Sequence, residues 1–409
     1  MKILITSDWY PGAINGVVTS ILNLKEELEK NGHEVKLLTL NTSSESDKSE
    51  DNVYSLGSVS VNAIYPNARI SAKMYSHLVK ELVNWHPDVI HSNSEFTTFL
   101  VAHRIAAACN VPLIHTYHTV YEDYTHYFCP SKHLGHLLVK GFTKKIIAQT
   151  DGVIVPTAKV KNLLNKYKVK EKIYVLPTGI KLDKFMAAVP VSWVKRKKEE
   201  LGIKDKKVVL FLGRLAKEKN IESLIDISAH FSEDTVLLLV GGGPHFDALQ
   251  DYVAKNNAES KVIFTGMVSP DEINRYYALG DIFTSASTSE TQGLTYIEAL
   301  SCGLPLVCIN DECLEGVIYN GVNGYKCESK EELLSKINEL TESDSLETMG
   351  RESRNLSRNF STEMFGFNAM KIYMKLIENG PKKKHMIILP HALVRVFDWL
   401  NELIDEIWS

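Results

Sequence analysis

The feature of this sequence that most limits its fold is a repeated alternation of two kinds of segment. Short runs rich in β-branched and other apolar residues alternate with longer stretches in which apolar residues recur at helical spacing. This order is typical of βαβ units, in which helices join parallel strands. Because the alternation runs through most of the chain, it predicts an α/β protein built on parallel sheets.

The predicted strands form two series, separated by a polar, lysine-rich connection that follows Pro177-Thr178-Gly179. The first series comprises residues 2–6, 35–40, 89–91, 113–116, 153–156 and 173–176, and the second comprises 208–213, 235–241, 262–265, 281–285 and 306–309. We therefore expect two doubly wound, Rossmann-like domains. Ligands of such sheets bind outside the carboxyl ends of the strands, so two domains of this kind that face each other make a cleft.

The composition excludes several classes of protein. Hydrophobic residues make up 44% and charged residues 23%, the profile of a folded globular chain. The sequence contains no run of about 18 apolar residues, so it predicts no spanning helix. The start of the chain does not resemble a signal peptide. The six cysteines form no CxxC pair, which favours reduced thiols in a cytosolic protein.

The net charge of −4 is unevenly distributed along the chain. Residues 1–180 carry a net charge of +3 and the remainder −7, and residues 132–172 hold ten lysines against only Asp151 and Glu171. A local field of this kind attracts anions such as phosphate, nucleic acid or acidic lipid. The other interpretation is a solvated helix face, and the charge pattern alone leaves both open.

The end of the chain has a separate pattern. After Pro381-Lys382-Lys383-Lys384, apolar residues recur at helical spacing. They are Leu393, Val396, Phe397, Leu400, Leu403, Ile404 and Ile407. This stripe predicts either a helix packed on the first domain or contact with a membrane surface. The acidic residues Asp398, Glu402, Asp405 and Glu406 on the polar face suit an anionic bilayer poorly.

Three glycine-containing turns follow predicted strands and are candidates for phosphate binding. The first runs from Pro11 to Gly16, the second is Gly213-Arg214 with Lys219 nearby, and the third is Gly241-Gly242-Gly243. Glycine lets the backbone approach a ligand closely, and a helix N-terminus offers free N–H groups. A guanidinium and an ammonium group at one strand end suit a diphosphate.

A fourth candidate site follows the predicted strand 281–285. Glu290 lies in the loop after this strand, and Glu298 lies about two turns into the next helix. Carboxylates placed in this way can accept hydrogen bonds from sugar and ribose hydroxyls. Gly293 and Leu294 stand at the helix start, where backbone N–H groups can hold phosphate oxygens.

Together these motifs resemble the signature of family 4 retaining glycosyltransferases, which have the GT-B fold. The resemblance lies in Glu290-x7-Glu298 with Gly293-Leu294 between, in Ala299-x-Ser301-x-Gly303-x-Pro305, and in the glycine turns and Pro177–Ile180, all in the family's order. It covers about residues 1–375. It implies domains at 1–180, for the acceptor and membrane, and at 181–360, for the nucleotide sugar. Residues 361–409 would then hold helices that cross back to the N-terminal domain and an amphipathic tail.

The segment from His115 to Tyr127 resembles the lipid-directed branch of this family, the bacterial diacylglycerol glucosyltransferases of glycolipid and lipoteichoic-acid anchor synthesis. His115 and His118 could also form a metal pair, but no third ligand has suitable spacing. The resemblance implies that the acceptor lies in a membrane, so the basic stretch gains a role in docking on anionic lipid. The residues expected there are Tyr121, Tyr124, Tyr127, Lys140, Lys144 and Lys145.

The resemblance also assigns roles to the candidate residues. Arg214 and Lys219 would neutralise the leaving diphosphate, Glu290 and His118 would contact the sugar, and Glu298 would hold the ribose. The nucleotide-sugar site would comprise Gly16, Gly213, Arg214, Lys219, Gly241, Gly242, Gly243, Glu290, Gly293, Leu294 and Glu298.

The implied activity is transfer of glucose from UDP-glucose to 1,2-diacylglycerol at the inner face of the cell membrane. We expect no tightly bound cofactor and no protein metal site, although a divalent cation could stimulate the reaction. No nucleic-acid partner is expected, and the sequence does not determine the oligomeric state. Transfer of another sugar, transfer to another acceptor, and a non-catalytic partner protein of the same family remain alternative interpretations.

Overall fold

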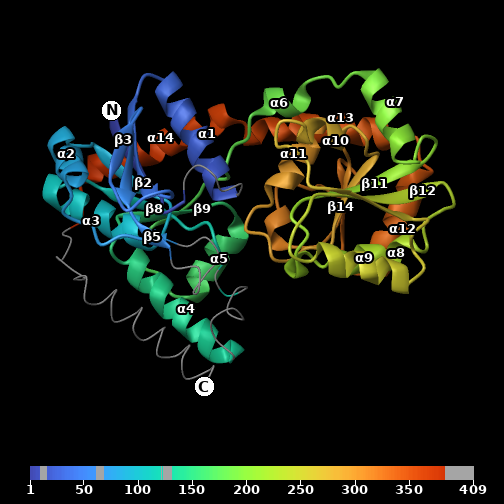
Figure 1. The fold of residues 1–409 in the computed structure, drawn as a ribbon, viewed down its shortest axis with the longest axis horizontal. Helices are drawn as coiled ribbons and strands as arrows, with labels where there is room; N and C mark the ends of the chain where they lie inside the picture. The colour runs from blue at the N-terminus through green and yellow to red at the C-terminus, as the bar shows by residue number, and fades with distance from the viewer. Residues whose placement is uncertain (10–15, 61–68, 121, 123–130, 383–409) are drawn as a thin grey trace. The chain divides into compact units, whose positions relative to one another are not determined.

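The structure, a computed structural model, describes the chain except residues 10–15, 61–68, 121, 123–130 and 383–409 (Figure 1). It divides into two compact units. The N-terminal unit contains Met1–Pro177 and the chain from Phe365 onward, and the C-terminal unit contains Thr178–Met364. The chain therefore crosses between the units twice, after Pro177 and after Met364.

The sheet of the N-terminal unit has the strand order β10-β9-β8-β7-β1-β2-β4-β3. All neighbours are parallel except β3, which pairs antiparallel with β4 at one edge. The strands are β1 Lys2–Thr6, β2 Glu34–Asn41, β3 Lys48–Glu50, β4 Val53–Gly57, β7 Val89–Ser92, β8 Leu113–Thr116, β9 Gly152–Val155 and β10 Ile173–Val175. A separate two-stranded hairpin joins β5 Val59–Ser60 to β6 Arg69–Ile70.

Helices cover both faces of this sheet. α1 (Gly16–Lys30) and α14 (Thr362–Asn379) share one apolar core with β1, whereas α2 (His77–Trp85) and α3 (Thr97–Cys109) pack with another set of strand residues. The remaining helices are α4 Lys132–Ile147 and α5 Ala158–Lys166. The expected return of C-terminal helices to the N-terminal domain is confirmed by α14, whose Phe365, Ala369, Tyr373 and Leu376 are buried in this core.

The C-terminal unit is an all-parallel sheet of order β13-β12-β11-β14-β15-β16. Its strands are β11 Lys207–Leu212, β12 Thr235–Val240, β13 Val262–Gly266, β14 Ile282–Ser285, β15 Leu306–Ile309 and β16 Gly324–Cys327. Its helices are α6 Leu182–Met186, α7 Val191–Glu200, α8 Ile221–Ser228, α9 Phe246–Lys255, α10 Ile273–Tyr277, α11 Leu294–Cys302, α12 Lys330–Thr341 and α13 Leu346–Ser357, with 3-10 turns η2 Lys217–Lys219, η3 Glu312–Leu314 and η4 Arg358–Phe360.

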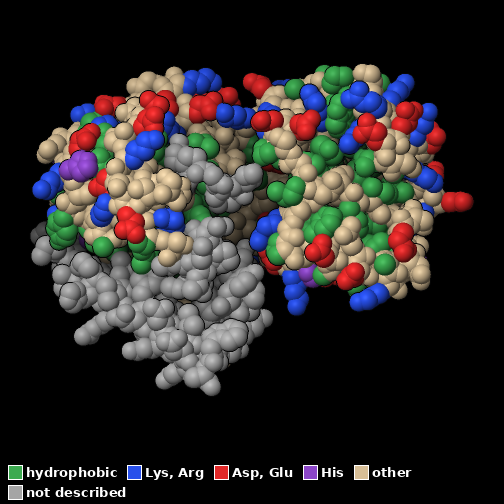
Figure 2. All heavy atoms as spheres, viewed as in Figure 1, with side chains coloured by type: hydrophobic (Ala, Val, Ile, Leu, Met, Phe, Trp, Pro, Cys, Tyr) green, Lys and Arg blue, Asp and Glu red, His purple; other side chains and the backbone are tan. Residues whose placement is uncertain are grey.

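The helices of the C-terminal unit lie in two layers. Figure 1 shows α8, α9 and α12 on one side of the strands and α10, α11 and α13 on the other. Strands buried from both sides must be almost wholly apolar, and β12 is buried at every position. On the outer face visible in Figure 2, Lys and Arg side chains are interspersed with Asp and Glu, so the acidic balance of this part of the chain forms no single patch there.

Every predicted strand is present, displaced by no more than one residue at either end. The polar segment 41–52, in which the sequence predicts no strand, contains β3. All three residues of β3 are exposed, so this edge strand carries no hydrophobic pattern that could reveal it.

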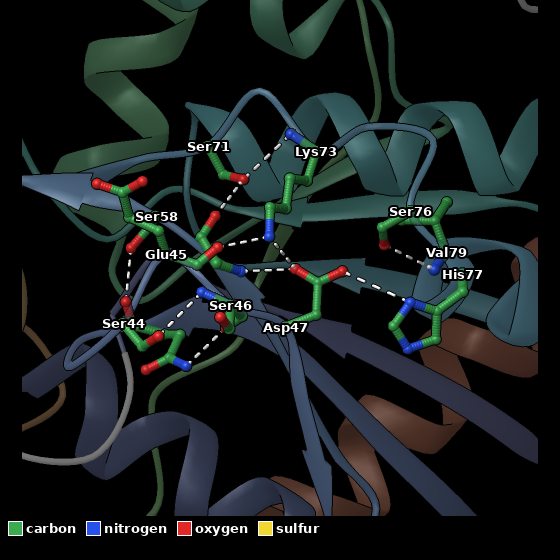
Figure 3. Close-up of polar contacts among 12 residues, drawn as sticks. Ser44, Glu45, Ser46, Asp47, Ser58, Ser71, Lys73, Ser76, His77 and Val79 are labelled. Atoms are coloured by element: carbon green, nitrogen blue, oxygen red, sulfur yellow. Dashed lines mark hydrogen bonds and ion pairs between the residues drawn. The ribbon is translucent and has the colours of Figure 1, made fainter.

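Polar contacts rather than apolar burial hold the segment before β3 in place (Figure 3). The carboxylate of Asp47 accepts a hydrogen bond from the backbone N–H of Gly57 at 2.8 Å and pairs with Lys73 Nζ at 3.2 Å. The hydroxyl of Ser71 donates to the carbonyl of Gly57 at 2.6 Å. These contacts fix the loops at the carboxyl ends of β2 and β4 against the segment that leads into α2.

Candidate active site

The loop between β14 and α11 is the centre of the candidate site in the C-terminal unit. Gly293 ends this loop with φ of 71°, a left-handed conformation that favours glycine, and a Cβ atom there would lie 2.4 Å from the ring of Tyr296. Helix α11 starts at the next residue, Leu294. The loop therefore delivers the chain to a helix N-terminus, whose N–H groups and partial positive charge suit a phosphate.

The loop is attached to the turn that follows β11. Lys219 Nζ donates to Glu290 Oε1 at 2.6 Å, and the hydroxyl of Ser289 donates to the carbonyl of Glu218 at 3.1 Å. The Lys219 and Glu290 side chains are 17% and 19% exposed, so the ion pair is mostly shielded yet still open to a ligand. Two residues that the sequence placed in different motifs are thus in direct contact.

Arg214 has a different partner. Its guanidinium pairs with Glu218, four residues further along the same turn, and its side chain is 51% exposed. The sequence predicts Arg214 and Lys219 as a joint diphosphate site. The structure places both cations at the carboxyl end of β11, with Lys219 against Glu290 and Arg214 nearer to solvent.

The glycines after β11 and β12 allow two turns to touch. Gly241 has φ of 130°, and a Cβ atom there would lie 2.1 Å from the carbonyl oxygen of Gly213. A Cβ atom at Gly243 would lie 2.3 Å from the carbonyl oxygen of Leu215, and one at Gly242 would lie 2.6 Å from Met267. Packing between the turns thus requires glycine at 241 and 243, where a Cβ atom would meet backbone, before any ligand is considered.

Glu298 lies on α11, held by a neighbouring helix. Tyr277 Oη, at the end of α10, donates to Glu298 Oε2 at 2.7 Å. Burial raises the pKa of the Glu298 carboxyl, and the bond from Tyr277 opposes that rise. Within the described chain, Oε1 of Glu298 makes no hydrogen bond, so this oxygen can accept one from a ligand hydroxyl.

In the N-terminal unit, His118 is held by Asn93. Asn93 Nδ2 donates to the carbonyl of His91 at 3.3 Å, which turns Oδ1 of the amide toward His118 Nε2 at 2.9 Å. His118 Nε2 must then carry the proton and donate, which leaves Nδ1 as an acceptor. Burial, together with the nearby His115, lowers the pKa of His118 to about 3, so the ring is neutral at ordinary pH.

Several polar groups beyond the carboxyl ends of β1, β7 and β8 were not predicted as sugar- or nucleotide-binding residues. Asp8 accepts hydrogen bonds from the backbone N–H groups of Thr98 at 2.8 Å and Phe96 at 3.3 Å, at the start of α3. Burial raises the pKa of Asp8 to about 7 against the lowering effect of the Thr98 bonds. His115 Nε2 lies 3.4 Å from the buried carboxylate of Glu95. The sequence could have pointed to Asp8 and Asn93 as polar residues that come just after the strands β1 and β7.

These groups lie where the strand order of the N-terminal sheet reverses. The chain proceeds from β1 to β2 on one side, whereas β7 pairs with β1 on the other. The crevice at such a switch point is the usual ligand site of a doubly wound sheet. Asp8 follows β1 and Asn93 follows β7, so both are correctly placed to border a ligand there.

The other predicted residues are distributed as follows. Gly16 is the exposed first residue of α1. Lys144 and Lys145 are exposed and Lys140 is half-buried on α4, whose outer surface also presents Leu134 and Leu137 at 48% and 52% exposure. Tyr121, Tyr124 and Tyr127, and the apolar stripe of 393–407, lie outside the described residues.

The described residues contain no cluster of three or more His, Cys, Asp or Glu side chains arranged to bind a metal ion. Among the helices that the structure describes, none combines the length and apolar character needed to span a membrane.

Comparison with known families gives two matches that together span most of the chain. Residues 14–184 match the family described as Glycosyltransferase Family 4, and residues 193–357 match Glycosyl transferases group 1. The alpha-monoglucosyldiacylglycerol synthase of Streptococcus pneumoniae is 35% identical, over 94% of this chain and 88% of that protein. The enzyme of the same name from Acholeplasma laidlawii is 30% identical, over 94% and 99%.

Solved structures share the fold. HepE from Anabaena, determined in complex with UDP-glucose, superposes with a TM-score of 0.69 at 17% identity, over 92% of this chain and all of that one. Sucrose-phosphate synthase from Thermosynechococcus elongatus gives 0.71 at 21% identity, over 93% of this chain and all of the other. The GT-B fold expected from the sequence is confirmed.

Proposed function

This chain belongs to the family 4 glycosyltransferases, and from that premise we propose that it transfers glucose from UDP-glucose to the hydroxyl of a 1,2-diacylglycerol. The product would be an alpha-monoglucosyldiacylglycerol, the lipid named for the two relatives that match this chain over most of its length. A donor of the same kind is bound by HepE, which has the same fold.

The observation that carries the proposal is the contact between Lys219 and Glu290 in a loop that opens onto the N-terminus of α11. An ammonium group and a helix start at one place provide positive potential for the diphosphate. Glu290 beside them offers oxygens to the hydroxyls of the sugar. Glu298, about one turn along α11 and oriented by Tyr277, offers Oε1 to the ribose.

His118 supplies a neutral acceptor in the N-terminal unit. Since Nε2–H of His118 donates to Asn93 Oδ1, the lone pair of Nδ1 can accept a hydrogen bond from a hydroxyl of the transferred sugar. A neutral ring suits this role because a protonated imidazole has no acceptor. The low pKa of about 3 keeps His118 in that form during the reaction.

The reaction needs no protein base. The acceptor oxygen bonds to C1 of the glucose as the bond from C1 to the β-phosphate oxygen breaks, and the acceptor proton passes to the departing phosphate. Negative charge grows on that phosphate, and Lys219, Arg214 and the N–H groups of α11 stabilise it. Attack from the face that the phosphate leaves would retain the configuration at C1.

The lipid acceptor brings the enzyme to a membrane surface. The outer face of α4 combines Leu134 and Leu137 with Lys144 and Lys145, a pattern suited to the boundary between acyl chains and anionic headgroups. Each lysine near such a surface contributes about 1 kcal/mol. We therefore propose peripheral binding of α4 to the inner face of the cell membrane.

The activity test supplies vesicles of diacylglycerol with radiolabelled UDP-glucose or UDP-galactose and identifies the labelled lipid. The proposal predicts one labelled product, a monoglucosyl diacylglycerol formed from UDP-glucose, and no product with Glu298→Gln. Labelling of an added glucosyl lipid in place of diacylglycerol would show that the acceptor is wrong. Label from UDP-galactose would show that the sugar is wrong.

The membrane test reverses the charge of Lys140, Lys144 and Lys145 together and measures sedimentation with anionic vesicles. Binding should fall roughly 100-fold or more and should also weaken as salt rises. The matched control reverses three cations of the C-terminal unit, Lys195, Arg196 and Lys204, which are exposed and lie outside α4. Equal losses for both triple variants would remove α4 as the docking surface.

A further inference from the structure

The loop that carries Glu290 is also attached to the point where the chain first enters the C-terminal unit. The backbone N–H of Thr178 donates to Gln292 Oε1 at 2.8 Å, and Gln292 Nε2 donates to the carbonyl of Thr178 at 3.0 Å. Both residues are buried, Gln292 at 5% exposure and Thr178 at 6%. A side-chain amide that satisfies both polar groups of one buried residue is costly to displace, because each broken bond leaves an unpaired group out of water.

The segment that begins at Thr178 is paired in turn with the segment that leads to the second crossing. Ile180 N–H donates to the carbonyl of Phe360 at 2.9 Å, and Thr362 N–H donates to the carbonyl of Ile180 at 3.2 Å. The second crossing follows Met364, two residues later. The two crossing segments, 178–180 and 360–362, therefore form one hydrogen-bonded pair, and Gln292 ties that pair to the loop.

On its other side the same loop is held by the donor-site contacts. Lys219 pairs with Glu290, and Ser289 bonds to the carbonyl of Glu218. Only one residue separates Glu290 from Gln292, which is too short a span of chain to absorb a displacement. A change in the position of Glu290 must therefore either carry Gln292 with it or strain its bonds to Thr178.

We propose that Gln292 is a positioning residue that couples occupancy of the donor site to the two crossing segments. The proposal rests on the proposed function, since it takes Lys219 and Glu290 as groups that meet the nucleotide sugar. A diphosphate that binds the ammonium group of Lys219 competes with Glu290 for it, and this changes what holds Glu290 in place. The amide of Gln292 transmits that change to Thr178, and through Ile180 to residues 360–362.

The test measures amide hydrogen exchange in the full-length protein with and without UDP. UDP should slow exchange in the peptides that contain Thr178, Ile180 and Thr362 by about tenfold, the scale of a modest local stabilisation. Calorimetry on the same sample establishes whether UDP binds. Bound UDP with unchanged exchange in both crossing segments overturns the coupling and leaves the proposed function intact, whereas absence of UDP binding overturns both.

The variant Gln292→Met keeps the length of the side chain and removes both hydrogen bonds. It should bind UDP with nearly unchanged affinity, lose the exchange response of the crossing segments, and show a kcat lowered about tenfold with KM for the donor little changed. Gln250→Met, an exposed position on α9, is the matched control and should behave as the unmodified protein. A full exchange response in Gln292→Met would overturn the proposal. If this variant fails to fold, the comparison of hydrogen exchange in the unmodified protein with and without UDP tests the proposal by itself.

Discussion

The two units place different chemistry at the carboxyl ends of their sheets. In the C-terminal unit the candidate groups are charged and partly exposed, as in the pair of Lys219 with Glu290. In the N-terminal unit they are mostly buried, and the ring of His118 is kept neutral. Under the proposed function, the C-terminal unit would neutralise the charge of the diphosphate and the N-terminal unit would bind neutral hydroxyls.

The same contrast extends to how each site is held. The loop between β14 and α11 is fixed by contacts to other loops, which involve Lys219, Ser289 and Gln292. In the N-terminal unit, Asn93, the partner of His118, directly follows β7, and His91 within β7 is held in turn by α14, with its Nδ1 2.6 Å from Tyr373 Oη. A loop site can adjust when a charged ligand arrives, whereas a site built on packed elements stays in place.

The largest expected effect concerns the charged site. Lys219→Met should lower kcat by about 10²–10³-fold, because a fixed cation acts most strongly on the charge that grows in the transition state. The matched control is Lys217→Met, an exposed lysine of the same 3-10 turn. Steady-state rates with UDP-glucose provide the measurement. Equal rates for the two variants would remove the distinction between a site lysine and a surface lysine.

The next effect concerns stability in acid, and it belongs to the N-terminal unit. Burial lowers the pKa of His91 to about 3 in the fold, against about 6.5 in the unfolded chain. Between those values the unfolded state binds the proton and the folded state does not, so stability falls as pH drops. From pH 6.5 to 4.5 this histidine should lower the free energy of unfolding by about 2–3 kcal/mol.

Asp8 acts in the opposite direction, since its pKa is raised to about 7, and the stability that this gives is lost as pH rises from about 4 to about 7. Comparison with a His91 variant separates the contribution of His91 to the acid dependence of stability from that of Asp8. Chemical denaturation at both pH values should show a weaker acid dependence in His91→Asn than in the unmodified protein. His77→Asn, at a side chain 75% exposed, serves as the control. An unchanged acid dependence in His91→Asn would contradict the burial of a neutral ring.

The smallest expected effect concerns the neutral acceptor. His118→Ala should lower kcat/KM about tenfold, the value of one neutral hydrogen bond, and leave the affinity for UDP unchanged. The control is His230→Ala, an exposed histidine of the C-terminal unit. In addition, the pH profile of the rate should show no loss of activity near pH 6.5 that comes from protonation of His118. A loss of activity there that disappears in His118→Ala would show a charged histidine and break the contrast between the units.

The sequence predicts the fold well because parallel strands buried on both faces need continuous apolar runs, as in β12. It misses β3 and β5, which are exposed, and β6 and β16, which are only partly buried. It also misses β4, although Tyr54 and Leu56 are buried there at alternate positions. Hydrophobic patterning reports burial, so strands without burial leave no such signal. The pairing of β3 with β4 is visible only in three dimensions.

A family signature in the sequence marks the charged residues of the C-terminal unit as candidates, and their roles in the site stay a prediction. It does not give their partners. The pair of Lys219 with Glu290 joins residues 71 positions apart, and the bonds of Gln292 to Thr178 join residues 114 apart. Asn93 and Asp8 were not singled out, because a single polar residue after a strand is common and only the switch point of the sheet brings these two together.

A crystal structure of the protein with UDP-glucose tests the central claim most directly. The account predicts phosphate oxygens within hydrogen-bonding distance of Lys219 Nζ and of the backbone N–H groups that start α11, with the ribose hydroxyls on Glu298. A nucleotide sugar bound with its phosphates away from both Lys219 and α11 would contradict it.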